Sequence, residues 1–236
     1  MSENPVVVLV HGAFAESASW NGVIERLQAQ SVETVAVANP LRSLEGDAQY
    51  VRDVIAGIGR PVVLVGHSYG GMVITEAAAD NEAVKALVYV CAFAPDHGET
   101  AFQLSLQFPG STLGDALNAY PVATGGNELA IRNEVFQQQF CADVPDDLAV
   151  LMAATQRPVT EAALTTGLPA ATPAWKSIPS WFVFSDLDLN IPVALHRFLA
   201  ERAGAKNTRE IAGGSHALSV SQPEAVTTTI LDALGS

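Results

Sequence analysis

Ser68 lies at the centre of GHSYGG (residues 66–71), a stretch of the form G-x-S-x-G. Small residues two positions before and after a serine let a strand turn sharply into a helix and leave the hydroxyl exposed at the corner. Here the motif follows an apolar run, residues 61–65, and precedes a segment rich in small residues. An ordinary glycine-rich turn is the alternative, but this context favours a nucleophilic serine, with a helix N-terminus behind it that attracts negative charge.

A nucleophilic serine needs a general base, and His216 is the histidine best placed to be one. It ends GGSH (residues 213–216), a loop between the last expected strand and the final helix. It also follows Ser68 in the chain order serine, acid, histidine that this kind of site requires. His196, within an expected helix beside an arginine, is expected at the surface. The other three are interpreted as structural or loop residues: His11, His67 and His97.

The acid that orients His216 should follow the expected strand at residues 180–185. Asp186 and Asp188 both stand there, and either carboxylate could stabilise the imidazolium form of the base. The residues themselves leave this choice open. The other carboxylate is expected to be exposed in the loop or to cap the next helix.

An oxyanion hole is predicted from two backbone amides. Gly12, in the turn after the first expected strand, lets the backbone approach a substrate closely. The amides of Ala13 and of Tyr69, the residue after the serine, would then bind the developing oxyanion. The alternative for the first turn is a plain strand-to-helix connection.

The elements that must hold these residues alternate along the chain. A continuous apolar run predicts a buried strand at residues 6–10, and further strands are predicted at residues 32–38, 61–65, 84–90, 180–185 and 206–211. Helical spacing predicts helices at residues 17–30, 44–58, 69–80, 192–203 and 223–234. This order indicates an α/β fold with a mostly parallel six-stranded sheet and helices on both faces.

The rhythm breaks between residues 96 and 176, where we find short helical patterns and no clear strand. Helices are expected at residues 115–120, 128–140, 146–156 and 160–166, which predicts a small helical cap inserted into a core of residues 1–95 and 177–236. Some of its apolar residues should line a substrate pocket, with Gly12 and Phe14 from the core, and the rest should anchor the cap. The candidates are Phe102, Leu106, Phe108, Leu148, Leu151, Met152 and Trp175.

Composition excludes several classes of function. The 236 residues are 49% hydrophobic and 16% charged, enough for a large core, and the net charge of −13 argues against nucleic acid as a partner. Cys91 and Cys141 have no metal-ligand or redox spacing, which fits a reducing cytoplasm. We see no signal peptide in residues 1–5 and no run long enough to span a membrane. The sequence does not decide whether the chain forms a homodimer.

Four stretches resemble the compact α/β-hydrolases that include plant methylesterases of the salicylate-binding type, hydroxynitrile lyases and small bacterial esterases. They are VVVLVHGAFAESASW (6–20), VLVGHSYGG (63–71), LDLNIPVALHRFLAERAGA (187–205) and AGGSHALSVSQP (212–223). The resemblance implies an α/β-hydrolase fold, the oxyanion amides of Ala13 and Tyr69, and no metal or cofactor. It also selects Asp188 as the acid, because the family's aspartate stands four residues before a proline, here Pro192.

The same resemblance separates three functions. Lyases of this family carry threonine where this chain has Gly12 and lysine where it has Ala217, so the cation that would stabilise departing cyanide is missing. A ligand receptor on the same scaffold would not need Ser68, Asp188 and His216 together. We therefore predict a serine esterase acting on small hydrophobic carboxylic esters, with a hydroxynitrile lyase or a ligand-binding protein as alternatives.

Overall fold

The computed structural model describes residues 4–123 and 125–235, so residues 1–3, on which the expectation about a signal peptide partly rests, lie outside it. Six parallel strands form the central sheet in the order β2-β1-β3-β4-β8-β9. They are β1 (Val6–Val10), β2 (Thr34–Val37), β3 (Val62–His67), β4 (Val84–Val90), β8 (Ser180–Ser185) and β9 (Asn207–Ile211). The predicted α/β fold with a mostly parallel six-stranded sheet is confirmed.

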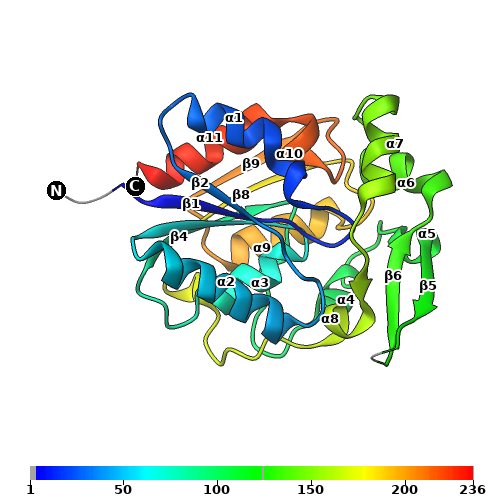
Figure 1. Cartoon of the computed structure of the whole chain (residues 1–236), viewed down its shortest axis with the longest axis horizontal. Helices are drawn as coiled ribbons and strands as arrows, with labels where there is room; N and C mark the ends of the chain where they lie inside the picture. The colour runs from blue at the N-terminus through cyan, green and yellow to red at the C-terminus, as the bar shows by residue number, and fades with distance from the viewer. Residues whose placement is uncertain (1–3, 124, 236) are drawn as a thin grey trace.

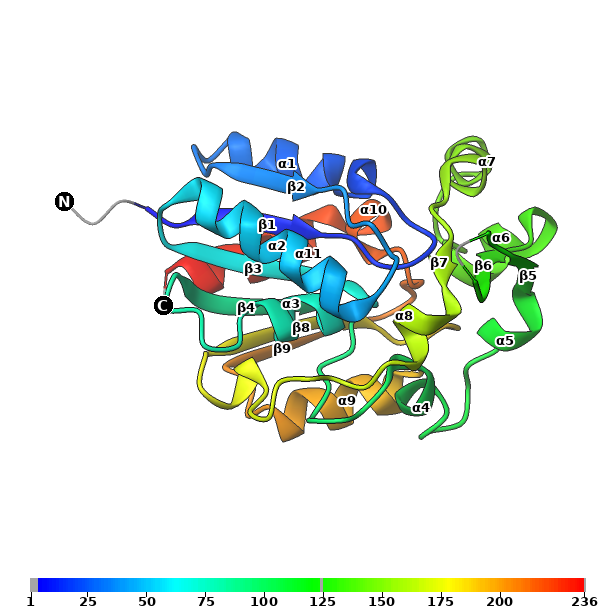
Figure 2. The ribbon, with the colours of Figure 1, turned by 60° about the horizontal axis from the view of Figure 1, so that its bottom comes forward.

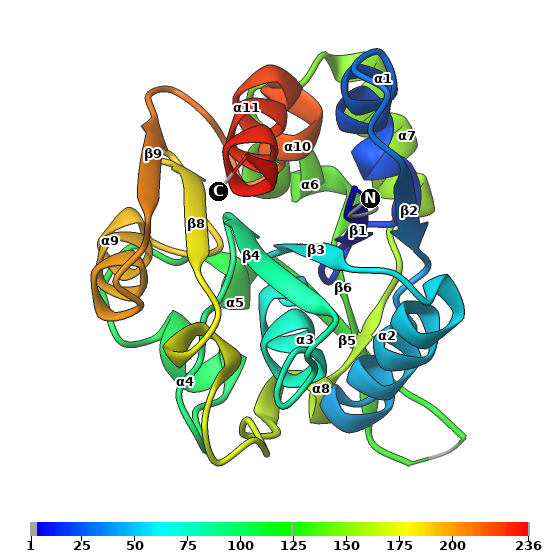
Figure 3. The ribbon, with the colours of Figure 1, turned by 90° about the vertical axis from the view of Figure 1, so that its left-hand side faces the viewer.

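Helices cover both faces of this sheet (Figure 1). On one face lie α1 (Asn21–Gln28) and α11 (Pro223–Leu234); on the other lie α2 (Leu44–Ile58), α3 (Gly70–Ala77) and α9 (Val193–Arg202). Figure 3, a view along the strands, shows the two helical layers with the sheet between them. β1 and β3 are buried along their whole length and β4 at every position but Lys85, which explains why these sequences are mainly apolar.

The segment between β4 and β8 contains strands as well as helices, so the expectation of a purely helical cap is wrong. The second sheet is antiparallel and consists of β5 (Leu117–Pro121), β6 (Asn127–Ile131) and β7 (Val159–Thr160). Gly125 and Gly126, both at positive φ, lie in the connection between β5 and β6. That pair is a hairpin signal that the helical interpretation overlooked.

Helices surround this second sheet at one end of the molecule, away from both chain termini (Figure 2). They are α4 (Ala101–Ser105), α5 (Leu113–Ala116), α6 (Asn133–Phe140), α7 (Asp146–Thr155) and α8 (Glu161–Thr165). We call residues 96–176 the cap. Backbone hydrogen bonds fasten the cap to the core: the Phe14 amide donates to the Arg157 carbonyl, and the Thr160 amide to the Leu41 carbonyl.

A membrane-spanning helix would have to be longer and more apolar than any helix in the described part of the chain.

Candidate active site

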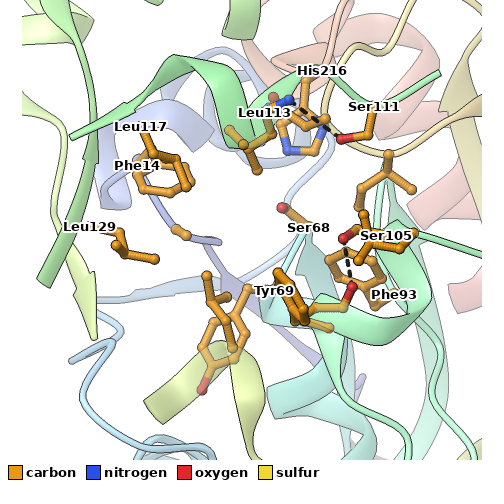
Figure 4. A pocket seen from close by; sticks show the side chains of 18 of the residues that line it. Phe14, Ser68, Tyr69, Phe93, Ser105, Ser111, Leu113, Leu117, Leu129 and His216 are labelled. Atoms are coloured by element: carbon orange, nitrogen blue, oxygen red, sulfur yellow. Dashed lines mark hydrogen bonds between the residues drawn. The ribbon is translucent and has the colours of Figure 1, made fainter. Parts of the chain in front are cut away.

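Ser68 occupies the corner between β3 and α3 in a left-handed backbone conformation, with φ of +54°. L-residues with a side chain adopt this region at an energetic cost, so its occurrence at a serine between a strand and a helix is informative. The corner is fixed by hydrogen bonds: the Ser68 amide donates to the Val90 carbonyl at 3.2 Å, and the Ser68 carbonyl accepts from the Gly71 amide at 2.9 Å. The hydroxyl points into an open cavity (Figure 4).

Two glycines allow the chain to pass this close to the serine. A Cβ atom at Gly71 would lie 2.1 Å from the Phe93 carbonyl oxygen, so α3 can pack there only without a side chain. A Cβ atom at Gly12 would lie 2.6 Å from the Ser68 Cβ. The turn after β1 and the turn after β3 therefore touch each other, and glycine is required at both contacts.

His216 and Asp188 meet behind the serine. The His216 ring reaches the same cavity as Ser68, and its Nδ1 donates to the Asp188 Oδ2 at 2.7 Å. Both side chains are buried. A ring held through Nδ1 keeps Nε2 available on the cavity side, which is the tautomer a general base needs.

Asp188 is the better held of the two candidate acids. Its Oδ1 accepts from the amides of Asn190 at 2.8 Å and Ile191 at 2.9 Å. Burial alone would raise the pKa of Asp188, but the His216 and His196 rings outweigh it and hold the pKa well below its ordinary value. Asp186 instead accepts from the Gly213 amide at 2.7 Å, so it fastens the loop that carries His216 and does not reach the ring.

His11 and His67 have structural contacts, as the sequence indicated. His11 Nε2 accepts from the Asn39 amide at 3.1 Å, which braces the turn after β1. His67 Nε2 lies 3.0 Å from the His216 carbonyl oxygen and supports the loop from below. Burial lowers the pKa of His11 to about 4 and that of His67 to about 3, so both rings are neutral near pH 7.

His196 is not at the surface, so that prediction is wrong. It is fully buried on α9, and its Nε2 lies 3.1 Å from the same Asp188 oxygen that binds His216. It faces the sheet beside Leu195 and Leu199, which are buried too. The exposed Arg197 next to it gave a misleading signal, because adjacent helix positions point in directions about 100° apart.

The two predicted oxyanion amides both belong to residues on the cavity wall. Within the described chain, neither the Ala13 nor the Tyr69 amide donates a hydrogen bond, whereas the Phe14 amide is occupied by the Arg157 carbonyl. The Tyr69 hydroxyl donates to the buried Asp47 at 3.0 Å, which fixes the position of the residue. Two unoccupied donors next to a serine hydroxyl are what an oxyanion requires.

The cavity above Ser68 has a volume of about 440 Å³ and is mainly apolar. Core and cap both contribute to its wall, so the site lies between them. The predicted Phe14, Phe102 and Leu106 line it. Apolar wall residues that the sequence did not single out are Phe93, Ala101, Leu113, Leu117, Leu129, Leu164 and Ile191.

Four predicted substrate-binding residues lie outside this wall. Leu148 and Met152 are on α7, which packs against α6 at the outer edge of the cap (Figure 1). Trp175 is buried at the base of the cap, where its Nε1 donates to the Pro95 carbonyl at 2.7 Å. Gly12 contacts Ser68 from beneath and is not part of the wall. For the cap residues, the error comes from the missed hairpin of β5 and β6, because its Leu117 and Leu129 form the part of the wall where helical side chains were expected.

A metal is not favoured by the donor groups near Asp188. Cys91, Asp188 and His196 bring three potential ligand atoms within 4.8 Å of one another. However, the carboxylate already accepts four hydrogen bonds, and burial raises the pKa of the Cys91 thiol far above its ordinary value. A neutral thiol is a poor metal ligand.

Several known proteins are similar to this chain over nearly its whole length. An alpha/beta hydrolase of Aspergillus novofumigatus, nvfD, is 28% identical, covering 98% of this chain and 97% of that protein. An alpha-hydroxynitrile lyase of Arabidopsis thaliana is 25% identical, covering 92% of each chain. Polyneuridine aldehyde esterase of Rauvolfia serpentina is 24% identical, covering 95% of this chain and 94% of that protein.

The fold leads to the same group. A crystal structure of polyneuridine aldehyde esterase superposes with a TM-score of 0.82 at 20% identity, covering 98% of this chain and 99% of that chain. The Alpha/beta hydrolase family matches residues 7–229, a range that contains the strained serine turn, the buried carboxylate and the histidine loop. On this match, supported by the parallel sheet and its order, the chain belongs to the alpha/beta hydrolase family.

Proposed function

We propose that this protein is a serine esterase that hydrolyses small hydrophobic carboxylic esters through an acyl-enzyme at Ser68. One observation carries the proposal: Ser68 and His216 open onto the same apolar cavity (Figure 4), and the buried carboxylate of Asp188 orients the histidine ring. The names of relatives such as polyneuridine aldehyde esterase agree with ester chemistry.

Acylation begins with proton transfer from the Ser68 hydroxyl to His216 Nε2 while the serine oxygen attacks the ester carbonyl carbon. The carbonyl oxygen gains the electron pair and becomes an oxyanion, which the Ala13 and Tyr69 amides bind. Collapse of this intermediate breaks the bond to the alkoxy oxygen, and His216 gives its proton to the leaving alcohol. Asp188 stabilises the transient imidazolium.

Deacylation repeats these steps with water as the nucleophile. His216 removes a proton from water, the hydroxide attacks the acyl carbon, and the same two amides bind the second oxyanion. Departure of the Ser68 oxygen, which takes its proton back from His216, releases the carboxylic acid. No metal or organic cofactor takes part in this scheme.

Cyanohydrin cleavage is the second candidate, because an alpha-hydroxynitrile lyase is among the relatives. Two positions argue against it. The first is Gly12, where the lyases that this chain resembles carry threonine. A Cβ atom at this position would lie 3.1 Å from the Tyr69 amide nitrogen and would crowd the oxyanion site, so this site does not accommodate the threonine. Ala217 is buried and uncharged, so it offers no cation beside His216 for departing cyanide. The two positions are independent, and both favour ester hydrolysis.

Covalent labelling tests the proposal directly. A fluorophosphonate should modify Ser68, as mapped by peptide mass spectrometry, and Ser68→Ala should abolish both labelling and hydrolysis of a short aryl ester. Ser105→Ala is the matched control, because Ser105 lines the same cavity but donates its hydroxyl to the Phe102 carbonyl. More than about a tenth of the activity remaining in Ser68→Ala would refute the nucleophile.

The same sample should be offered mandelonitrile. Cyanide release well above a blank of the same pH, without Ser68-dependent ester cleavage, would replace esterase by lyase. A panel of esters that varies acyl length and alcohol size then defines which end of the substrate fills the 440 Å³ cavity.

A further inference from the structure

Asp188 binds two histidine rings through a single oxygen. Its Oδ2 is 2.7 Å from His216 Nδ1 and 3.1 Å from His196 Nε2, while Oδ1 is held by two backbone amides. The described mechanism uses His216 and leaves His196 without a role. A polar ring this deeply buried in the core carries a desolvation cost, which indicates that its contact with the carboxylate matters.

The surroundings of His196 determine its protonation. Its ring stacks on Phe184, with 5.0 Å between centroids and 13° between planes. Nδ1 is buried and has no hydrogen-bond partner in the described part of the chain. Burial also lowers the pKa of His196. The ring is therefore neutral, carries its proton on Nε2, and donates that proton to Asp188.

We propose that His196 is a positioning residue that acts through Asp188: its Nε2–H fixes the shared carboxylate oxygen and makes it a weaker acceptor toward His216. This inference rests on the proposed role of the Ser68, His216 and Asp188 set. A hydrogen bond to an ionised carboxylate withdraws charge from the oxygen that accepts it. Without His196, Oδ2 would bind the His216 proton more strongly and would also be free to move.

Other titratable groups near this set are neutral or distant from the shared oxygen. The ring centroid of His67 lies 4.7 Å from that of His216, but its lowered pKa keeps it neutral. The Cys91 thiol is kept protonated by burial. Two acids also act on members of this cluster by charge alone, Glu210 on β9 and Asp143 in the loop between α6 and α7. The acidic limb of the activity profile therefore reports the Asp188 and His216 pair.

Three variants separate donation from packing. His196→Leu removes the donor, His196→Gln offers an amide N–H close to the position of Nε2, and His196→Asn offers one only near Nδ1. In His196→Leu, we expect kcat to fall about tenfold with KM little changed. The midpoint of the acidic limb of kcat/KM should rise by about half a unit to one pH unit. His196→Gln should restore both quantities, and His196→Asn should resemble His196→Leu.

A spectroscopic measurement reads the same effect without turnover. In a Ser68→Ala background, the proton between His216 Nδ1 and Asp188 should give a downfield ¹H NMR signal, and His196→Leu should move it further downfield. Signals that do not move, with near-ultraviolet circular dichroism showing a folded protein, would overturn the inference even if Ser68 proves to be the nucleophile. Equal kinetic losses in the Leu, Asn and Gln variants would also overturn it by indicating packing alone.

Failure of the proposed function looks different. If Ser68→Ala keeps its ester hydrolysis, the proposed acyl-enzyme at Ser68 is refuted, while the NMR shift still decides whether His196 donates to Asp188. A moved signal would then support the donor contact, and an unmoved one would refute it.

Discussion

Two carboxylates separated by one residue have different surroundings, and these decide what each can do. Asp188 is fully enclosed and bound to His216, whereas Asp186 is partly exposed and bound to a loop amide. Two aspartates in the same loop look alike in sequence, so residue reasoning left both open. The resemblance to known hydrolases selected Asp188, and the structure brings that one to the histidine.

Asp188→Asn should lower kcat for ester hydrolysis by about 10³–10⁴, because the amide would favour the wrong tautomer of His216 and could not stabilise its charged form. Steady-state kinetics on a short aryl ester measures this loss. Asp186→Asn is the matched control and should cost less than about tenfold, since it only weakens a loop contact. A larger loss in Asp186→Asn than in Asp188→Asn would reverse the assignment of the acid.

At the scale of elements, the strands of the buried sheet core were predicted better than those of the cap. The strands β1, β4 and β8 were predicted with their observed bounds, because buried parallel strands need uninterrupted apolar runs. β5 and β6 are as long as β1, but β5 is mostly exposed and β6 only partly buried, so their residues carry little hydrophobic pattern and both strands were missed. The cap pocket was therefore the part of the site that sequence reasoning described worst.

The histidines also show what sequence patterns can and cannot predict. His216 was found from its position in a loop and from chain order. His196 was assigned to the surface because no sequence pattern marks a buried ring that contacts a carboxylate eight positions away. The one available signal was the apolar spacing of Leu195 and Leu199, which places the neighbouring position on or near the buried face of α9.

The contact between α3 and the loop after β4 predicts an asymmetry between two glycines. Gly71→Ala should lower the free energy of unfolding by about 3 kcal/mol or more, because its Cβ would overlap the Phe93 carbonyl. Gly57→Ala on α2 should raise it by about 0.5–1 kcal/mol, since nothing lies within 4 Å and alanine favours the helix. Urea denaturation measures both changes. A Gly71→Ala variant as stable as Gly57→Ala would show that α3 can shift away from the Phe93 carbonyl.

At the scale of the whole molecule, the neutral buried histidines couple stability to pH. The pKa of His11 is about 4 in the folded chain, against an ordinary value near 6.5 in the unfolded chain. Between these values the unfolded state binds a proton that the folded state does not. The free energy of unfolding therefore falls as the pH drops through this window, by up to about 1.4 kcal/mol per pH unit for each such group.

Urea denaturation at several pH values between 7.5 and 4.5, at constant ionic strength, should show this loss. In His11→Gln the dependence should be shallower by about 1 kcal/mol per pH unit, because one proton-linked group is removed. His97→Gln, at an exposed position, should leave the slope unchanged. A steep profile retained in His11→Gln would assign the acid sensitivity to other groups.

The left-handed backbone of Ser68 sets activity against durability. Placing a residue with a side chain at that φ destabilises the fold by about 1–2 kcal/mol. Glycine would avoid this cost, but it has no hydroxyl to act as a nucleophile. Directed evolution that selects for thermal stability alone would therefore enrich inactive variants with glycine at position 68. Obtaining a more thermostable variant of this protein therefore requires a screen that also tests each variant for ester hydrolysis.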